Sequence, residues 1–261
     1  MRQRYLLARQ WVMQMGGRLR EATKQPFDFS TKTGHQDIVT AFDKEVETFF
    51  RRNIRENFEH DHIVGEEYAP SDGDETKVTW YIDPVDGTTN FVNLQKHFAI
   101  SVGCYLNHVP QFAFVYDVIG DDLFSAFAGE GAYKNDKRLG GKKPTADLGK
   151  MILSTPNVQD AFWRGYPWQN SMLKLAEQVR AVRSLGSVAL ELCAVAEGIV
   201  DIFVAMRSAP WDHNGARLIL LESGCKICAL GLDTLPVDRE MAIFACRSEE
   251  VYQTLKNDYG F

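Results

Sequence analysis

The sequence predicts a layered α/β protein, with an N-terminal α+β half built on an antiparallel sheet and a C-terminal α/β half. Apolar residues recur at helical intervals in roughly the first sixty residues. Four strand-like runs separated by short polar turns follow, and beyond Lys150 strands and helices alternate. Because there is no repeat, low-complexity tract or long linker, we expect one domain, 1–261, with lobes at about 1–147 and 148–261.

Composition limits the possible partners and compartment. The chain has 261 residues, of which 45% are hydrophobic and 25% charged, and its net charge is −6. Without a basic run, nucleic acid and anionic membranes are poor candidates for partners. The N-terminus mixes arginines among apolar residues, so it predicts neither a signal peptide nor a membrane span. Five cysteines, an odd number, favour reduced thiols and a cytoplasmic protein.

The N-terminal half is expected to contain two helices and then mainly strands. Apolar residues with helical spacing are Leu7, Trp11, Met15 and Leu19 in the first helix, and Val39, Phe42, Val46, Phe49, Phe50 and Phe58 in the second. His62–Glu67 is predicted as a short strand ending in acid, Ser71–Thr76 as a polar turn and Val78–Ile82 as a buried strand. An antiparallel meander is then predicted over Phe98–Leu106, Gln111–Ile119, Asp122–Ala128 and Gly131–Asn135.

The C-terminal half is expected to alternate. Strands are predicted at Met151–Pro156, Asp201–Met206, Lys226–Leu230 and Ala242–Cys246, and helices at Ala161–Arg180, Ser187–Gly198, Trp211–Gly224 and after Ser248. Gly198 and Gly224 are placed to end their helices, and Ser248 to cap the last one. The single CxxC, Cys225 and Cys228, falls in a strand-like run where residues three apart point to opposite faces. Core thiols are therefore favoured over a zinc or redox site.

Acidic residues stand at the ends of several of these elements, where rigid scaffolds present catalytic groups. They are Asp43, Glu66, Glu67, Asp83, Asp86 and Asp212. Between the two central aspartates, Pro84 fixes φ and the carbonyl of Val85 is free, so a tight turn can aim two carboxylates and a main-chain oxygen at one point. Oxygen-only clusters suit hard cations, Mg²⁺ above all.

A run of small and hydroxyl residues follows the second of these aspartates. Gly87, Thr88 and Thr89 offer main-chain N–H groups and hydroxyls, which can hold an anion. Any one of the acids alone is more simply a solvated turn residue or a helix cap, as Asp212 would be for the dipole of its helix. Together, acids that hold metal beside donors that hold phosphate favour a metal-assisted phosphatase.

Three motifs carry a resemblance to a known family. GEE (Gly65–Glu67), WYIDPVDGTTNFV (Trp80–Val92) and PWDHNGARLILLESG (Pro210–Gly224) resemble the inositol monophosphatase family, in the superfamily that includes fructose-1,6-bisphosphatases and bisphosphate nucleotidases. The resemblance extends from Asp37–Asp43 to the C-terminal helix. It implies an α-β-α-β-α sandwich of the sugar-phosphatase type, a phosphoric monoester hydrolase acting on a small-molecule phosphate monoester, two or three Mg²⁺ per site, and a homodimer.

The resemblance also implies a role for each site residue. Metal ligands would be Glu66, Asp83, the Val85 carbonyl, Asp86 and Asp212; catalytic residues Glu66, Thr88 and Asp43; substrate-binding residues Asp86, Gly87, Thr88, Gly186, Ser187, Ala205 and Asp212. Thr88 would help Glu66 activate water, and Asp43 would lie near a third metal. Lys32 and Asp37 match loosely a lysine and an aspartate on a mobile loop of the family. The implied reaction is direct attack of a metal-bound water, without a phosphoenzyme.

The sequence departs from the family pattern on the substrate side. Ala205 stands where inositol-specific members carry a glutamate, which removes an acceptor for ring hydroxyls. Arg207 is either a solvated side chain or a partner for a second anionic group. For His213, a polar residue in the first turn of a helix is favoured over acid–base work. Alternatives to inositol monophosphate are NADP, a 3′-phosphonucleotide and fructose-1,6-bisphosphate.

Two other mechanisms are open. Phosphatases of the haloacid dehalogenase type use a DxDxT strand end with a nucleophilic aspartate, but the spacing here is DxxD and Glu66 stands upstream. A non-catalytic regulator on a retained scaffold is the other, although every predicted ligand is present. A covalent aspartyl-phosphate on Asp83 would favour the first alternative.

Overall fold

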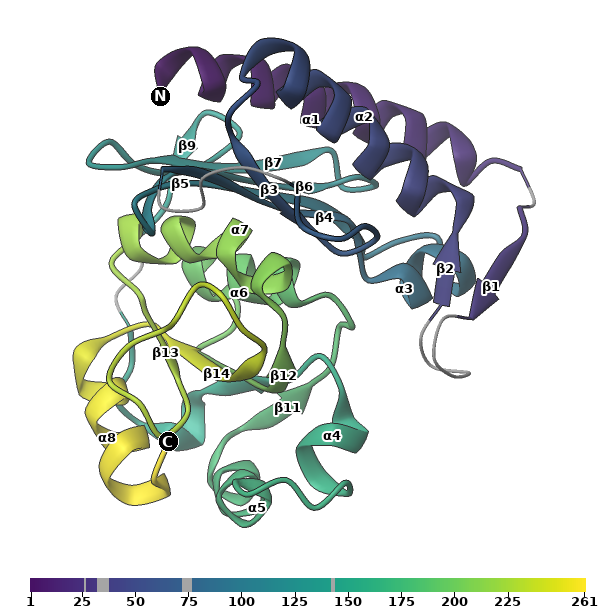
Figure 1. The fold of residues 1–261 in the computed structure, drawn as a ribbon. Helices are drawn as coiled ribbons and strands as arrows, with labels where there is room; N and C mark the ends of the chain where they lie inside the picture. Colours follow the sequence, from purple (N-terminus) through teal and green to yellow (C-terminus); the bar gives the residue numbers. More distant parts are fainter. Residues whose placement is uncertain (26, 32–37, 72–76, 142–143) are drawn as a thin grey trace.

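The computed structural model describes residues 1–25, 27–31, 38–71, 77–141 and 144–261, and it forms five layers. Helices α1 (Arg2–Ala22) and α2 (Ala41–Asn57) cover one sheet, and helices α6 (Val188–Glu197) and α7 (Pro210–Glu222) separate that sheet from a second one (Figure 1). Further helices lie on the outer side of the second sheet. The predicted layered fold class is confirmed.

The larger sheet carries the predicted meander. Its seven strands are in the order β3 (His62–Gly65), β4 (Val78–Asp86), β5 (Ala99–Leu106), β6 (Val109–Asp117), β7 (Asp122–Phe127), β8 (Gly131–Lys134) and β9 (Lys137–Arg138). All neighbours are antiparallel except β3 and β4, which are parallel. The pairing of β4 with β5 shifts between Asp83 and Asp86, so the strand extends through the aspartates and bends there.

The second sheet is mixed. Its order is β11 (Ala181–Arg183), β10 (Ile152–Ser154), β12 (Ile202–Ser208), β14 (Met241–Cys246) and β13 (Lys226–Ala229). Strand β10 is parallel to both of its neighbours, whereas β14 is antiparallel to β12 and β13. The outer helices are α4 (Val158–Phe162), α5 (Gln169–Gln178) and α8 (Glu249–Tyr259), the last capped by Ser248 as predicted. The two sheets fall on either side of residue 147, but the lobe boundary stays a prediction.

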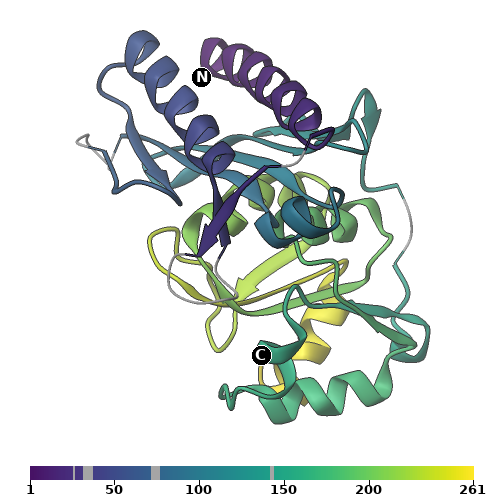
Figure 2. The ribbon, with the colours of Figure 1, turned by 90° about the vertical axis from the view of Figure 1, so that its right-hand side faces the viewer.

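The short elements complete the chain. They are β1 (Phe29–Thr31), β2 (Ile38–Thr40), α3 (Thr88–Asn93) and the 3₁₀ turn η1 (Leu148–Lys150). In Figures 1 and 2, β1 and β2 form a separate two-stranded ribbon beside α3, at one edge of the larger sheet. The predicted loop residues Lys32 and Asp37, and most of the predicted turn at Ser71–Thr76, lie outside the described residues.

The single helix predicted at Ala161–Arg180 is wrong, because the segment forms α4 and α5 with a break between them. Gly165 has φ of +74°, which ends α4 beyond its last turn. Pro167 disfavours helical geometry at the residue before it and supplies no N–H donor to a helix. The apolar spacing continued across this break and concealed it.

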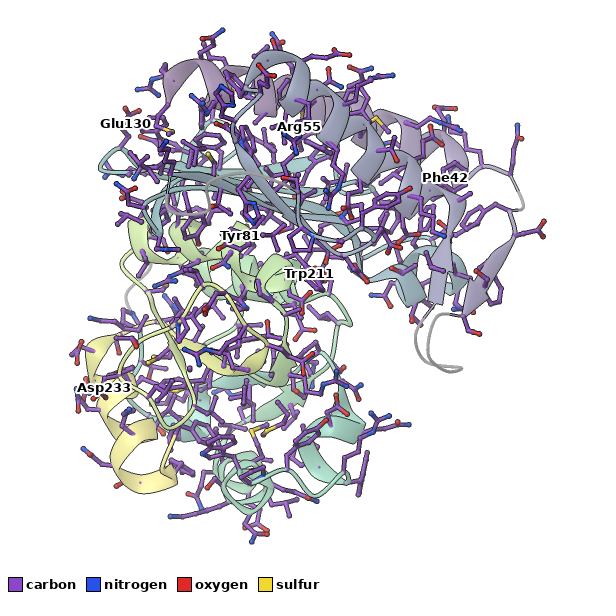
Figure 3. All side chains as sticks on the ribbon, in the orientation of Figure 1. Phe42, Arg55, Tyr81, Glu130, Trp211 and Asp233 are labelled. Atoms are coloured by element: carbon purple, nitrogen blue, oxygen red, sulfur yellow. The ribbon has the colours of Figure 1, made fainter. Side chains whose placement is uncertain are left out.

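Side chains fill the space between the layers (Figure 3), and those that are buried there are mostly apolar. One cluster joins α1 and α2 to the larger sheet around Trp80 and Phe50, both fully buried. The five cysteines, all within the described residues, are buried free thiols. Cys225 and Cys228 belong to different apolar clusters, as expected for opposite faces of a strand. Within the described ranges, no helix has the length and apolar character needed to cross a bilayer.

Candidate active site

The candidate site lies where β4 ends and α3 begins. Asp83 is 2% exposed, and one of its carboxylate oxygens accepts from the Val85 N–H at 3.1 Å. The turn to α3 passes through Gly87, whose φ is +89°. A Cβ at Gly87 would lie 3.1 Å from the carbonyl oxygen of Gly186, so the close approach of this turn to the loop before α6 requires glycine here.

Thr88, the first residue of α3, connects this turn to α2. Its hydroxyl lies 3.1 Å from a carboxylate oxygen of Asp43 and 3.0 Å from the carbonyl oxygen of Val85. Both are acceptors and a hydroxyl has one proton, so Thr88 can donate to only one of them at a time. The Val85 carbonyl, expected to be free, is therefore within hydrogen-bond distance of a side chain of its own turn.

Asp43 is held by the start of α2. It is fully buried and closes a capping box, in which its carboxylate accepts from the Thr40 N–H at 2.8 Å. Burial raises the pKa of Asp43, and the hydrogen bonds from Thr40 and Thr88 oppose that rise. The arrangement places Thr88 against Asp43, whereas the resemblance had paired Thr88 with Glu66.

Asp86 reaches across from the larger sheet and binds the start of α6. Its carboxylate accepts from the Ala189 N–H at 2.7 Å, from the Val188 N–H at 3.1 Å and from the Ser187 hydroxyl. Burial raises the pKa of Asp86 to about 6, and these hydrogen bonds oppose the rise. Ser187 also caps α6 by accepting from the Leu190 N–H. One acid thus joins the larger sheet to the first turn of α6.

Two residues that the sequence reasoning missed hold the loop before α6. The Glu191 carboxylate accepts from the N–H groups of Leu185 and Gly186, each at 2.9 Å, and from the Ser154 hydroxyl. The Asn90 amide donates to the carbonyl of Leu185 at 2.6 Å. The carboxylate of Glu191, in the middle of a mostly apolar helix, was the available signal. Gly186 is predicted to bind the substrate, but its N–H group donates to Glu191 within the protein.

Glu191 gives a pH-dependent prediction. Burial raises its pKa from 4.5 to about 7. Between these values the unfolded chain releases the proton before the folded one, so Glu191 lowers stability as the pH rises through this range. The loss is on the order of 3 kcal/mol when complete. Glu191→Gln has no carboxyl group to titrate at this position. The variant should therefore gain stability relative to the wild type as the pH rises from about 5 to about 7.

Urea unfolding at several pH values measures this difference. Glu177→Gln, on the exposed surface of α5, is the matched control for replacing one glutamate by glutamine. A constant difference between Glu191→Gln and the wild type over the same range would contradict the assignment.

The acids of the site repel one another. The pKa of Asp83 lies well above its ordinary value because of burial and the negative charges of Glu66, Asp86, Asp212 and Asp43. The pKa of Asp212 is raised by burial and by the charges of Asp86 and Glu66. Acids from four separate parts of the chain therefore lie within electrostatic reach of one another, and a cation would relieve their repulsion.

Asp212 and Glu66, which come from α7 and from the end of β3, have different local surroundings. Asp212 is the third residue of α7, after Pro210, and accepts from the Ala209 N–H at 2.7 Å. Glu66 follows β3 and is partly buried. Among the described residues, no three His, Cys, Asp or Glu side chains already form a compact metal cage. The donor chemistry, carboxylate and carbonyl oxygen only, nevertheless fits Mg²⁺.

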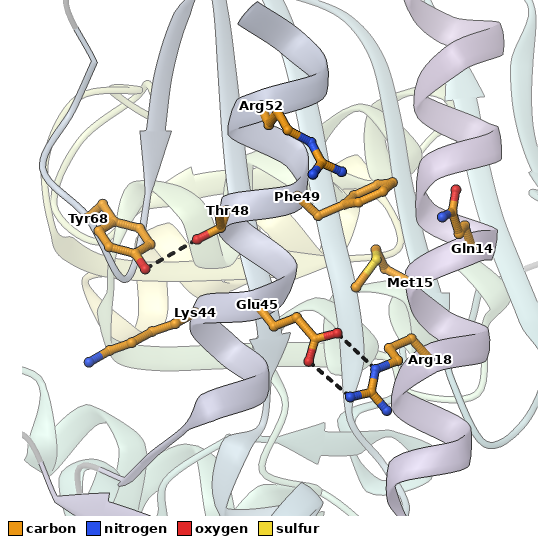
Figure 4. Close-up of a pocket in the computed structure, with 9 residues that line it drawn as sticks. All are labelled: Gln14, Met15, Arg18, Lys44, Glu45, Thr48, Phe49, Arg52 and Tyr68. Carbon is orange, nitrogen blue, oxygen red and sulfur yellow. Dashed lines mark hydrogen bonds and ion pairs between the residues drawn. The ribbon is translucent and has the colours of Figure 1, made fainter.

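The segment after Glu66 turns away from these acids. The Glu67 N–H donates to the buried Glu47 at 2.6 Å, and Tyr68 lies 3.2 Å from the Thr48 hydroxyl. Tyr68 lines a cavity of about 530 Å³ between α1 and α2, on the outer face of the molecule (Figure 4). None of the predicted site residues lines this cavity.

The substrate-side residues have clear surroundings. Ala205 is 1% exposed and packs in the apolar cluster between the two sheets. Arg207 is neither free nor merely solvated, because it forms a two-point ion pair with Glu240. His213 is fully buried, with its Nδ1 3.0 Å from the Ser208 hydroxyl. Burial lowers the pKa of His213 to about 3, so the imidazole is neutral and has a structural role.

Comparison with known proteins identifies the family. The model of the "Inositol monophosphatase family" matches residues 1–254. The chain belongs to this family. Its members are phosphoric monoester hydrolases that depend on metal, and the chain is an enzyme of this class.

Two relatives illustrate the similarity in sequence. "Inositol-1-monophosphatase" of Bacillus subtilis (strain 168) is 38% identical over 222 residues, which cover 84% of this chain and 82% of the relative. "Nus factor SuhB" of Escherichia coli (strain K12) is 35% identical over 195 residues, which cover 75% and 73%. The chain thus resembles both a protein named as an inositol monophosphatase and a protein named as a Nus factor.

Solved structures share the fold. The staphylococcal protein SaIMPase-II with bound inositol monophosphate is 30% identical, has a TM-score of 0.84, and the match covers 98% of this chain and 92% of that one. The same protein with bound 2′AMP gives 31% identity, a TM-score of 0.86 and coverage of 98% and 93%. An IMPase/NADP phosphatase complexed with Mg²⁺ and phosphate, 22% identical, has a TM-score of 0.87 with coverage of 99% and 97%.

Proposed function

We propose that the chain is a Mg²⁺-dependent phosphomonoesterase that hydrolyses a small phosphorylated metabolite, such as inositol monophosphate, by direct attack of water. The observation that carries the proposal is the mutual repulsion of Asp83 with Glu66, Asp86 and Asp212 at the end of β4. A charge arrangement this unfavourable in a folded protein is typical of a functional site. Family membership and the B. subtilis relative support the same conclusion.

The two or three cations would be held by Glu66, Asp83, Asp86, Asp212 and the Val85 carbonyl. Oδ2 of Asp86 already accepts two hydrogen bonds from the start of α6, but Oδ1 accepts only one and has a second lone pair for a cation. Bound there, Mg²⁺ would neutralise phosphoryl charge and lower the pKa of water.

The chain's own groups would position the reactants. When the Thr88 hydroxyl donates to Asp43, its oxygen can accept from a water molecule and orient that water. The first N–H groups of a helix lack partners inside the helix, so those of Thr88 and its neighbour Gly87 would bind phosphate. Gly186 and Ser187 would shape the leaving-group side, while Ala205 offers it no polar group.

We also propose that the enzyme acts in the cytoplasm as a homodimer, without nucleic-acid or membrane partners. Nucleotide substrates are a second candidate, because SaIMPase-II, at 31% identity, has a structure with bound 2′AMP. NADP, a 3′-phosphonucleotide and fructose-1,6-bisphosphate therefore belong in the same test.

A panel of phosphate monoesters tests the proposal. Phosphate release from inositol monophosphate, NADP, a 3′-phosphonucleotide, fructose-1,6-bisphosphate and p-nitrophenyl phosphate is measured with Mg²⁺ and with EDTA, and the substrates are compared by kcat/KM. We expect Mg²⁺-dependent release, with inositol monophosphate among the best substrates. Release that persists in EDTA, or a trapped aspartyl-phosphate on Asp83, would overturn the mechanism. No release from any of these five substrates would contradict the proposed substrate class.

A further inference from the structure

A carboxylate, that of Glu240, lies near the start of the helix that carries Asp212. Position 205, where inositol-specific members carry a glutamate, is an alanine in this chain. Strands β12 and β14 are antiparallel, with Ser208 opposite Met241. Glu240, just before β14, therefore lies beside the end of β12, where the chain turns into α7 and reaches Asp212. Spacing along the chain does not predict this neighbourhood, because Glu240 and Asp212 are far apart in the sequence.

Arg207 fixes the position of Glu240. The Arg207 Nε and Nη2 groups donate to the two carboxylate oxygens of Glu240, each at 3.0 Å. The two side chains are 51% and 50% exposed, so solvent and small molecules can reach them. The pair lies at the end of β12, and α7, whose third residue is Asp212, begins at Pro210, two residues beyond that end.

We propose that the Arg207–Glu240 pair determines specificity by binding hydroxyl groups of the leaving alcohol, so that the enzyme prefers polyol or sugar monophosphates to substrates with a second phosphate. The inference rests on the proposed function and deepens it. A substrate hydroxyl can donate to Glu240 while its oxygen accepts from the remaining N–H groups of Arg207. The pair is fixed before the substrate arrives, which lowers the entropy lost on binding.

The same pair disfavours a second phosphate at this position. The Arg207 guanidinium and the Glu240 carboxylate together carry no net charge, so the pair does not attract an anion. The negative charge of Glu240 also repels an incoming phosphate. The bound carboxylate would have to be displaced before Arg207 could meet a phosphate. The structure thus favours a hydroxyl-bearing leaving group over the bisphosphate alternative.

Glu240→Ala and a matched variant test the inference. The ratio of kcat/KM for inositol monophosphate to that for p-nitrophenyl phosphate, which lacks hydroxyls, should fall about tenfold in Glu240→Ala, as expected for one lost hydrogen bond to a charged group. The fall should come from a higher KM for inositol monophosphate rather than a lower kcat. The kcat/KM for fructose-1,6-bisphosphate should rise, because Arg207 is freed.

The control is another exposed two-point pair, Arg18–Glu45, which joins α1 to α2 at 2.8 and 3.2 Å. Glu45→Ala should leave all substrate ratios as in the wild type, and neither variant should change the Tm much, because exposed ion pairs contribute about 0–1 kcal/mol. If Glu240→Ala showed the same substrate ratios as Glu45→Ala, the inference would be overturned, and the proposed function would stand. A wild type that hydrolyses none of the three substrates would overturn the proposed function, and the inference with it.

Discussion

Asp83→Asn should lower kcat by about 10²–10⁴-fold, while the Tm of the metal-free protein stays the same or rises. Loss of a cation ligand removes several kcal/mol of charge stabilisation in the transition state, and each 1.36 kcal/mol corresponds to about a tenfold change in rate. The stability result has a separate cause. Asp83 is buried among four other acids, so removing its charge relieves repulsion in the folded state.

Asparagine is the suitable replacement because its side-chain oxygen can still accept from the Val85 N–H. Steady-state kinetics with saturating Mg²⁺ and thermal unfolding in EDTA measure the two effects. Glu250→Gln, on the exposed surface of α8, is the control for loss of one negative charge and should match the wild type in kcat. Wild-type kcat in Asp83→Asn, or a large fall in its Tm, would contradict the account of this site.

Asp86→Ala should lose both activity and stability, whereas Asp83→Asn should lose activity only. Its carboxylate holds the Val188 and Ala189 N–H groups and the Ser187 hydroxyl at the start of α6. Removing it leaves these buried donors unpaired and uncaps a helix, which we expect to cost about 2–4 kcal/mol. Asp86 is therefore more than a metal ligand, since it also ties the two sheets together through α6.

Urea unfolding in EDTA measures this loss. Ser187→Ala, which removes only the hydroxyl donor and cap, should lose about 1 kcal/mol. Asp86→Asn, which keeps one acceptor oxygen, should be intermediate and serves if the alanine variant does not fold. Wild-type stability in Asp86→Ala would show that these contacts do not join the lobes.

Much of the fold was predictable because its signals are local. The meander has alternating runs and polar turns, and the helices that end at Gly198 and near Gly224 have their capping residues. Three-residue strands such as β1, β2 and β11 carry too little periodicity to be recognised. The break between α4 and α5 was missed because apolar spacing continued across Gly165 and Pro167.

The candidate site was predictable in its residue types but not in its contacts. Acids at element ends indicated a cation site, and the motif at the end of β4 indicated the family. The bond from Asp86 to α6 joins residues about a hundred positions apart, and no spacing rule reports it. The same holds for Thr88 with Asp43, and for Glu240 beside the end of β12. Such pairings depend on how the two sheets pack.

A crystal structure with Mn²⁺ and phosphate tests the central idea most directly, because Mn²⁺ replaces Mg²⁺ and can be located by its anomalous scattering. We predict ions bound by Glu66, Asp83 and Asp212, with the phosphate against the start of α3. Density for the ions elsewhere, or these three side chains pointing away from one another with no ion between them, would contradict a metal-dependent phosphatase site at the end of β4.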